Sequence, residues 1–244
     1  MSIFKKAKLD LLIEEFVSKF DDEEDQALKK LKKKTLDPLI FSLDYKKRGE
    51  DFRWEEAATY QAIRKARENR IGDLHEQLFD LLPDWKRMPH GGSLPDLVCD
   101  SKKFIVELKS REDTPKASDK PVIYDSLKAN LDLKQYEGYT AVFGHILNSS
   151  KKAMVSPELF TPSDAKTKSR RPANNKILRM DGRLLWSLAT SKSKTPISPY
   201  ENPNAIISVY GEVLDSIFRV NGGTADPDMM STLLGLQKAN FKLK

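Results

Sequence analysis

The first third of the chain carries apolar residues at helical spacing. Between residues 9 and 20, leucine, isoleucine, valine and phenylalanine recur every three or four positions, which predicts an amphipathic helix. A second helix is expected over residues 24–34, before Leu36-Asp37-Pro38, because proline cannot continue a helix. A third helical pattern covers residues 52–82 and ends at Pro83. The pattern therefore predicts a helical N-terminal region.

The middle of the chain changes to the two-residue alternation of β-strands. The segments SLPDLVCD and FIVELKS, joined by the polar turn Ser101-Lys102-Lys103, predict a hairpin of two antiparallel strands. Side chains alternate between the two faces of such a strand. In the second strand one face carries Phe104, Val106 and Leu108, and the other carries Ile105, Glu107 and Lys109. Glu107 and Lys109 are thus expected to share a face.

Helical and strand patterns alternate after this hairpin. The expected elements are a helix over residues 120–133, a central strand over 139–147, a short strand over 176–180, a helix over 181–189 capped by Asp181, and a helix over 205–220 after a proline-rich connector. This order predicts an α/β fold, with a mixed sheet flanked by helices.

We expect this fold to have three parts in one compact domain. A helical region over residues 1–68 packs on a catalytic core over 69–190, and a connector with C-terminal helices covers 191–244. The apolar residues of the last long helix suit either the core or a dimer surface, and we expect the core. These residues are Ile206, Ile207, Val209, Val213, Leu214 and Ile217.

Composition narrows the class of protein. The 244 residues are 39% hydrophobic and 32% charged, which is typical of a soluble globular protein. No apolar run is long enough to cross a membrane, and MSIFKKAKLD lacks the apolar stretch of a secretory signal, so we expect a cytoplasmic protein with no membrane partner. The single cysteine, Cys99, excludes an internal disulfide and a cysteine-based zinc site. It is expected to be a small core residue, and any metal is expected to have oxygen ligands.

The charge balance favours an anionic partner. Lysine and arginine number 42 against 36 acidic residues, a net charge of +6, although proteins that bind nothing acidic also reach this value. Near the hairpin, Lys102, Lys103 and Arg111 would face a phosphate backbone. The polar loop KTKSRRPANNK would contact phosphates or base edges, or would simply be solvated. Its candidate DNA-binding residues are Arg170, Arg171, Asn174, Asn175 and Lys176.

The hairpin carries the candidate chemistry. Pro95-Asp96 precedes the first strand, and antiparallel pairing would bring Asp96 within reach of Glu107. The two carboxylates would then offer the oxygen ligands that Mg²⁺ prefers, for one or two ions. Lys109 would hold or deprotonate the attacking water, or offset the charge that builds on a phosphate. The alternative is a solvated face with a weak ion pair, but the Pro-Asp at a hairpin's distance favours a phosphodiesterase.

Two residues of the preceding helix are further candidates. Glu76 is a candidate additional metal ligand. His75 is a candidate catalytic residue, or else a polar surface residue or a core histidine with a satisfied partner.

The residues Pro95-Asp96 and Glu107-Leu108-Lys109 resemble the motif of the PD-(D/E)XK nuclease superfamily. A longer likeness, from Asn69 to Thr190, is to the type II restriction endonucleases of the AvaII and SinI kind, which cut GGWCC or GGNCC. The segments that carry it are NRIGDLHEQLF, DLVCDSKKFIVELKSREDTPKASDKPVIYDSLKANL, YEGYTA and RMDGRLLWSLAT. The chain departs from that family after Lys109, where a segment with Asn-Thr at its end is replaced by Ser110 to Thr114. The departure leaves the DNA contacts open.

The resemblance implies a function. Asp96, Glu107 and Lys109 would carry Mg²⁺-dependent hydrolysis of double-stranded DNA at a short GGWCC-like or GGNCC-like palindrome, with Glu76 or His75 in support, leaving 5′-phosphate ends. A homodimer is expected, because a palindrome presents equivalent half-sites to equivalent subunits. A DNA methyltransferase is expected as a genetic rather than physical partner.

Two other functions stay open from the residues alone. One is a structure-specific or repair nuclease of the same superfamily, which would cut junctions, mismatches or ends without a fixed sequence. The other is a non-catalytic DNA-binding regulator. The presence of both acidic residues and the lysine argues against it.

Overall fold

A computed structural model gives the fold of residues 2–33, 53–89, 94–148, 154–164, 167–191, 204–223 and 227–241, with residues 39, 42, 46, 91 and 202. The chain divides into two compact units, one of residues 1–13 and 75–244 and the other of residues 14–74. The expected domain boundaries stay predictions. Most of the proline-rich connector lies outside the described residues.

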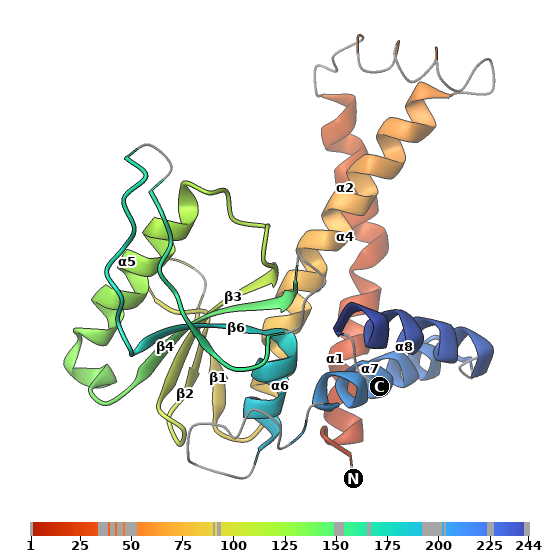
Figure 1. Ribbon diagram of the computed structural model, residues 1–244. Coiled ribbons are helices and arrows are strands. Elements are labelled where there is room, and N and C mark those ends of the chain that lie inside the picture. Colours follow the sequence, from red (N-terminus) through yellow and green to blue (C-terminus); the bar gives the residue numbers. More distant parts are fainter. Residues whose placement is uncertain are drawn as a thin grey trace. The chain divides into compact units, whose positions relative to one another are not determined.

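The smaller unit is helical. It holds the end of α1 (Lys6–Ser18), α2 (Phe20–Lys32) and the larger part of α4 (Trp54–Asp80), coloured red to orange in Figure 1. The predicted helices are confirmed, although α1 and α2 begin a few residues earlier than their apolar residues indicate. Within this unit the Arg70 guanidinium lies over the Phe16 ring, 5.9 Å from its centroid.

The larger unit contains a six-stranded mixed sheet in the order β1-β2-β3-β4-β6-β5. Its strands are β1 (Trp85–Arg87), β2 (Leu97–Cys99), β3 (Phe104–Arg111), β4 (Thr140–Leu147), β5 (Glu158–Leu159) and β6 (Ile177–Asp181). β3, β4 and β6 run parallel, while β1, β2 and β5 pair antiparallel. The hairpin and the central strand β4 are confirmed. The short edge strands β1 and β5 were not predicted, because two or three residues are too few to show a period.

Helices cover both faces of the sheet (Figure 1). On one face, Tyr124 and Leu127 of α5 (Asp119–Leu131) join a buried cluster with Ile105, Ala141 and Ile177. On the other face lies α6 (Gly182–Thr190). Sequence alternation therefore assigned the faces of β3 correctly, but both faces are buried along the first half of the strand.

The packing of α6 depends on local chemistry at its start. The Asp181 carboxylate accepts a hydrogen bond from Leu184 N at 3.0 Å, so the predicted cap is confirmed. A side chain has no room at position 182, because a Cβ added to Gly182 would lie 2.5 Å from Ile146 O. Further along, the Trp186 ring stacks on Phe79 of α4 at 4.1 Å between centroids. These contacts bury Trp186 completely.

The C-terminal helices α7 (Ala205–Val220) and α8 (Pro227–Phe241) complete the larger unit, together with the short 3₁₀ helix η1 (Lys134–Tyr136). Ile206, Val209 and Val213 of α7 are buried, as expected for core residues. The Glu212 carboxylate accepts hydrogen bonds from Ile3 N at 2.7 Å and Phe4 N at 3.0 Å, which ties the N-terminal segment to α7. None of the helices among the described residues has the length and apolar character needed to cross a membrane.

The three parallel strands define two edges of the sheet. Their first residues, Phe104, Thr140 and Ile177, form what we call the amino edge. Their last residues, Arg111, Leu147 and Asp181, form the carboxyl edge. In register, Lys109 of β3 lies beside His145 of β4, which lies beside Asp181 of β6. These two edges carry different charged groups.

Candidate active site

The hairpin holds Asp96 beside the carboxyl half of β3. Leu97 of β2 pairs with Val106 of β3, so Asp96, one residue earlier, lies across from Glu107. The Asp96 carboxylate accepts a hydrogen bond from the Leu108 backbone N–H at 2.7 Å, and its carbonyl accepts one from Met88 N at 2.9 Å. Backbone on both sides therefore fixes Asp96.

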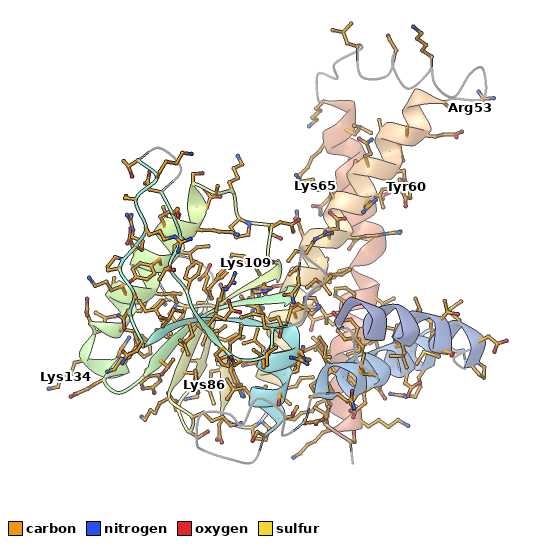
Figure 2. All side chains as sticks on the ribbon, in the orientation of Figure 1. Arg53, Tyr60, Lys65, Lys86, Lys109 and Lys134 are labelled. Atoms are coloured by element: carbon orange, nitrogen blue, oxygen red, sulfur yellow. The ribbon has the colours of Figure 1, made fainter. Side chains whose placement is uncertain are left out.

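Lys109 joins the two carboxylates. Its Nζ lies 2.7 Å from Glu107 Oε1 and 3.6 Å from Asp96 Oδ2. The three side chains are between 17% and 28% exposed, so water reaches the group but does not surround it. Figure 2 shows Lys109 beside β3. The structure thus brings together the three residues that the sequence placed in one site.

The electrostatics of this group follow from partial burial. Burial raises the pKa of Glu107, and the nearby Asp96 charge raises it further against the opposing effect of Lys109. Burial lowers the pKa of Lys109, but the charges of Asp96 and Glu107 outweigh it and the net direction is upward. The surroundings therefore favour the charged form of Lys109 and disfavour the charged form of Glu107.

Glu76 reaches the site from α4. Its Oε2 lies 3.0 Å from Arg87 Nε, and its charge contributes to raising the pKa of Lys109. Arg87, at the end of β1, was not singled out in the sequence, because nothing local marks WKR as a strand. The pairing with Glu76 is visible only in the tertiary structure.

His75 points elsewhere. Its Nε2 lies 3.3 Å from the Tyr210 hydroxyl of α7, and burial lowers its pKa to about 4. None of the contacts described for its side chain is to Asp96, Glu107 or Lys109. The structure therefore does not bring His75 together with the carboxylates, and a catalytic role for it stays a prediction.

The first basic pair lies at the amino edge. The Lys102 ammonium donates hydrogen bonds to Leu188 O and, at 2.6 Å, to Ser191 O, the last carbonyls around α6. The Lys103 ammonium lies 4.7 Å from the centroid of the Tyr139 ring. At 3.3 Å per residue, Lys103 is about 20 Å along the strand from Lys109. The expectation that Lys102 and Lys103 flank the site is therefore wrong in position, and their DNA contacts stay predictions.

Arg111 is the candidate DNA-binding residue that lies closest along the strand to Lys109. Arg111 is the last residue of β3, and its side chain lies on the same face of the strand as those of Glu107 and Lys109. It is exposed and forms an ion pair with Asp113 at 3.3 Å. Its contact with DNA stays a prediction.

The loop before β6 leads away from that edge. Arg170 is exposed and forms an isolated antiparallel β-bridge with Ser163. Arg171 donates hydrogen bonds from Nε and Nη2 to the Asp125 carboxylate of α5, at 2.9 and 2.7 Å. Asn174 Oδ1 accepts a hydrogen bond from Lys176 N at 2.9 Å, and the Lys176 carbonyl accepts one from Ala141 N at 2.8 Å. Asn174, Asn175 and Lys176 thus lead into the amino edge. Their contacts with DNA stay predictions.

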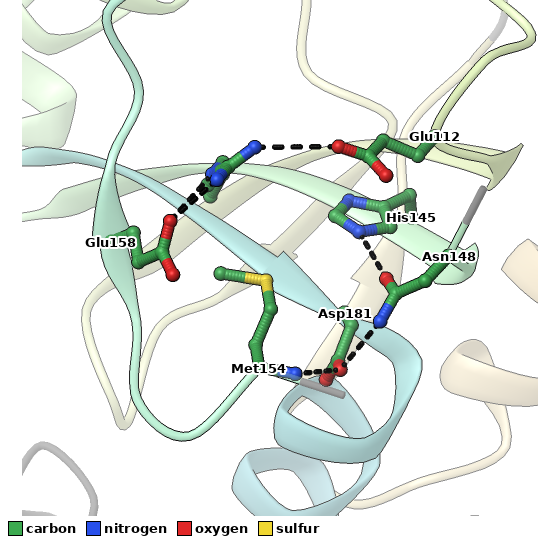
Figure 3. A network of polar contacts seen from close by, with 7 residues as sticks. Glu112, His145, Asn148, Met154, Glu158 and Asp181 are labelled. Atoms are coloured by element: carbon green, nitrogen blue, oxygen red, sulfur yellow. Dashed lines mark hydrogen bonds and ion pairs between the residues drawn. The ribbon is translucent and has the colours of Figure 1, made fainter. Parts of the chain in front are cut away.

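A polar network that sequence reasoning missed lies at the carboxyl edge (Figure 3). His145 Nε2 lies 2.6 Å from Asn148 Oδ1, and Asn148 Nδ2 donates to Asp181 Oδ2 at 3.1 Å. Asp181 Oδ2 also accepts from Met154 N at 2.8 Å. Because a carboxylate only accepts, the amide orientation is fixed and His145 carries its proton on Nε2. The network therefore joins the end of β4 to the start of α6.

An ion-pair cluster adjoins this network. Arg179 of β6 lies 3.3 Å from Glu112 and also pairs with Glu158 of β5. Burial lowers the pKa of His145, with the charge of Glu112 opposing. The only sequence signal for these residues was their place at strand ends, which does not reveal the partners.

The donor set at Asp96 and Glu107 fits a divalent cation. Two carboxylates face a single ammonium, and burial, followed by the Asp96 charge, raises the pKa of Glu107. Among the described residues, His, Cys, Asp and Glu form no group of three arranged to hold a metal. A site with two carboxylates and remaining positions for water and phosphate oxygens suits Mg²⁺ rather than zinc.

Comparison with known proteins assigns the chain to a family. The family model described as Eco47II restriction endonuclease matches residues 1–209, which include the whole sheet and every residue of the candidate site. The comparison with curated proteins gave no match.

Proposed function

The chain belongs to the Eco47II restriction endonuclease family, and we propose that Asp96, Glu107 and Lys109 form its active site. Membership makes it a type II restriction endonuclease, a hydrolase that cleaves DNA site-specifically. The observation that carries the proposal is the approach of the Lys109 ammonium to both carboxylates, 2.7 Å from Glu107 and 3.6 Å from Asp96. We assign the pattern of Pro95-Asp96 and Glu107-Leu108-Lys109 to the PD-(D/E)XK superfamily.

In this proposal each side chain has a separate task. Lys109 stays protonated, so its ammonium orients the attacking water and offsets charge that develops on the phosphate. Asp96 is held in place by the Leu108 N–H, which keeps its carboxylate directed at the site. Glu107 in its ionised form would accept the proton of the water, and burial makes that carboxylate a stronger base because it raises its pKa. Glu76 contributes through its charge.

We propose Mg²⁺ as the cofactor, held by Asp96 and Glu107. The ion would supply a Lewis acid for the scissile phosphate and lower the pKa of water. The residues themselves provide oxygen ligands, partial shielding from solvent and an uncompensated negative charge.

The substrate proposal is more specific than the family. We propose cleavage of double-stranded DNA at a short palindrome like GGWCC or GGNCC, with 5′-phosphate ends, by a homodimer in the cytoplasm, with a DNA methyltransferase as genetic partner. We propose that Arg111 contacts a phosphate near the scissile bond, because it continues the face of Glu107 and Lys109.

The test is digestion of unmethylated plasmid and phage DNA with Mg²⁺, followed by sequencing of the ends. Discrete fragments whose ends share one sequence support the proposal, and the Lys109→Ala protein should yield none. The same reaction with EDTA should also yield none.

Other outcomes separate the alternative functions. Cleavage confined to branched, mismatched or nicked DNA would indicate a structure-specific nuclease. Binding of DNA with no cleavage at any Mg²⁺ concentration would indicate a non-catalytic regulator. Cleavage by the Lys109→Ala protein at the natural rate would show that the active site lies elsewhere.

A further inference from the structure

The candidate active site and its surroundings contain two separate groups of paired charges. Asp96 and Glu107 share the Lys109 ammonium, whereas Glu76 has a cation of its own in Arg87, at 3.0 Å. Arg87 pairs in the sheet with Leu97, the residue after Asp96, so its partner Glu76 lies near the site. Glu76 is therefore near enough to matter to the site but is already paired.

The backbone places Arg87 firmly. In β1 it pairs with Leu97, next to Asp96, and its own N–H donates to Asp80 Oδ1 at 2.8 Å. Asp80 and Glu76 are one turn apart on α4, so α4 binds both the backbone and the side chain of Arg87. The contact is thus built into the packing of α4 on β1.

The Glu76–Arg87 pair is largely shielded from water. The side chains are 11% and 23% exposed. Removing one partner from such a pair leaves a buried charge without compensation, which is strongly unfavourable. To coordinate a metal, Glu76 would have to break its ion pair with the Arg87 guanidinium.

We propose that Arg87 is a positioning residue that keeps Glu76 away from the metal, so that each chain binds one divalent cation through Asp96 and Glu107. This inference rests on the proposed function. In this inference Glu76 is a fixed charge paired with Arg87 rather than a metal ligand.

The ligand chemistry agrees with a single cation. Asp96 and Glu107 face each other across one ammonium, so two negative charges meet a single positive charge and a divalent cation would balance the remainder. The described residues offer no third His, Cys, Asp or Glu in a position to join them. Mg²⁺ commonly binds one or two carboxylates and keeps several waters.

The experiment starts from the full-length protein, free of metal and of DNA, and titrates it with Mn²⁺. Electron paramagnetic resonance measures the free ion, which gives the number of ions bound per chain and their affinity. The natural protein should bind one Mn²⁺ per chain, and Glu76→Gln should change neither the number nor the affinity by more than about threefold. Arg87→Met removes the guanidinium from the Glu76 carboxylate and should tighten binding about tenfold or add a second ion, since affinity follows the charge of the ligand set. The double variant with Glu76→Gln should return to the natural affinity.

Each contrary outcome has its own meaning. If Glu76→Gln weakens Mn²⁺ binding as much as Asp96→Asn, Glu76 is a ligand and the inference is wrong while the proposed function stands. Two ions per natural chain, or no gain in Arg87→Met, also overturns the inference. If Asp96→Asn and Glu107→Gln leave Mn²⁺ binding unchanged, the proposed metal site itself fails.

A conservative variant guards against a trivial loss of structure. Arg87→Lys keeps the positive charge, so it should retain natural Mn²⁺ affinity, whereas a change caused by packing alone would appear in both Arg87 variants. If Arg87→Met does not fold, Glu76→Gln still decides in the natural protein whether that carboxylate is a ligand.

Discussion

Each end of the β2–β3 hairpin has a lysine beside a carboxylate, in different surroundings: Lys86 of the neighbouring strand β1 at the turn, and Lys109 of β3 at the other end. At the turn, Lys86 Nζ lies 2.8 Å from Asp100, whose other oxygen accepts a hydrogen bond from the Tyr139 hydroxyl at 2.7 Å. The lysine and aspartate side chains there are 66% and 53% exposed. At the other end, Lys109 lies between Glu107 and Asp96, all more than two-thirds shielded. Figure 2 shows the two lysines well apart.

The difference in solvent exposure gives the carboxylates of the two clusters opposite pKa shifts. The Lys86 hydrogen bond, and then the Tyr139 one, lower the pKa of Asp100, so the exposed carboxylate is simply more stable as an anion. Burial and then the Asp96 charge raise the pKa of Glu107. A lysine beside a carboxylate is therefore an ordinary surface pair at one end, and at the other it belongs to a partly buried group in which ionised Glu107 is disfavoured.

The largest difference between the two ends should appear in DNA cleavage. Lys109→Ala should lower the single-turnover cleavage rate on the order of 1000-fold, because a charge donor at the developing phosphate charge is lost. Lys86→Ala is the matched control, an exposed lysine beside an aspartate, and should stay within about twofold. Gel-based plasmid cleavage measures both. Equal losses would remove the distinction.

A buried histidine extends the contrast to acid stability. Burial lowers the pKa of His75 to about 4 from 6.5, so the folded protein takes up this proton later than the unfolded chain. Stability from this group is complete above pH 6.5 and is lost as the pH falls toward 4, by up to about 3 kcal/mol.

Urea unfolding of the natural protein and His75→Gln at pH 7, 6, 5 and 4.5 measures this loss. The glutamine variant should lose less stability on acidification. Parallel curves would contradict the assignment. Contributions of His145 and Glu107 are common to both proteins and cancel in the difference.

A smaller effect concerns the stability of the metal-free site. Glu107→Gln should raise the free energy of unfolding by about 1 kcal/mol near pH 7, because it removes a charge that burial disfavours. Since the folded pKa is raised, the natural protein should approach the variant as the pH falls toward 4.5.

The matched change at the turn has the opposite sign. Asp100→Asn removes a carboxylate whose pKa is lowered, so it should reduce stability at neutral pH, with the difference vanishing as the pH falls below 3.8. Thermal unfolding across pH measures both variants. Destabilisation by Glu107→Gln would contradict the electrostatic argument.

The smallest expected effect separates the two edges in DNA binding. Arg111→Ala should weaken binding several-fold and reduce the slope of log affinity against log salt by about one. Lys103→Ala, about 20 Å from Lys109, should change both less. Fluorescence anisotropy with a duplex in Ca²⁺ at several salt concentrations measures the slopes. A larger loss for Lys103 would place the duplex along the amino edge.

Much of the fold could be predicted because its signals are local. The periodicity of apolar residues gave α7 with its observed bounds, and Asp181 gave the cap of α6. β1 could not be found, since three residues show no period and the strand exists only through its pairing with β2. Its absence from the prediction also hid Arg87.

The candidate site divides in the same way. Asp96, Glu107 and Lys109 come from two adjacent strands, so alternation and the length of the hairpin were enough to bring them together. Lys102 looked equally available for phosphate, but its ammonium is occupied by the carbonyls at the end of α6, 86 residues away in the chain. Long-range packing of this kind leaves no local trace.

By itself, the sequence determined the helices, the hairpin and the face that Glu107 and Lys109 share, because these follow from side-chain direction along a short stretch of backbone. Only the tertiary structure decided which basic residues lie near that face, that Arg87 holds Glu76, and that His145 stands beside Lys109. These depend on the order in which distant strands pair and on how much water is left around each charge.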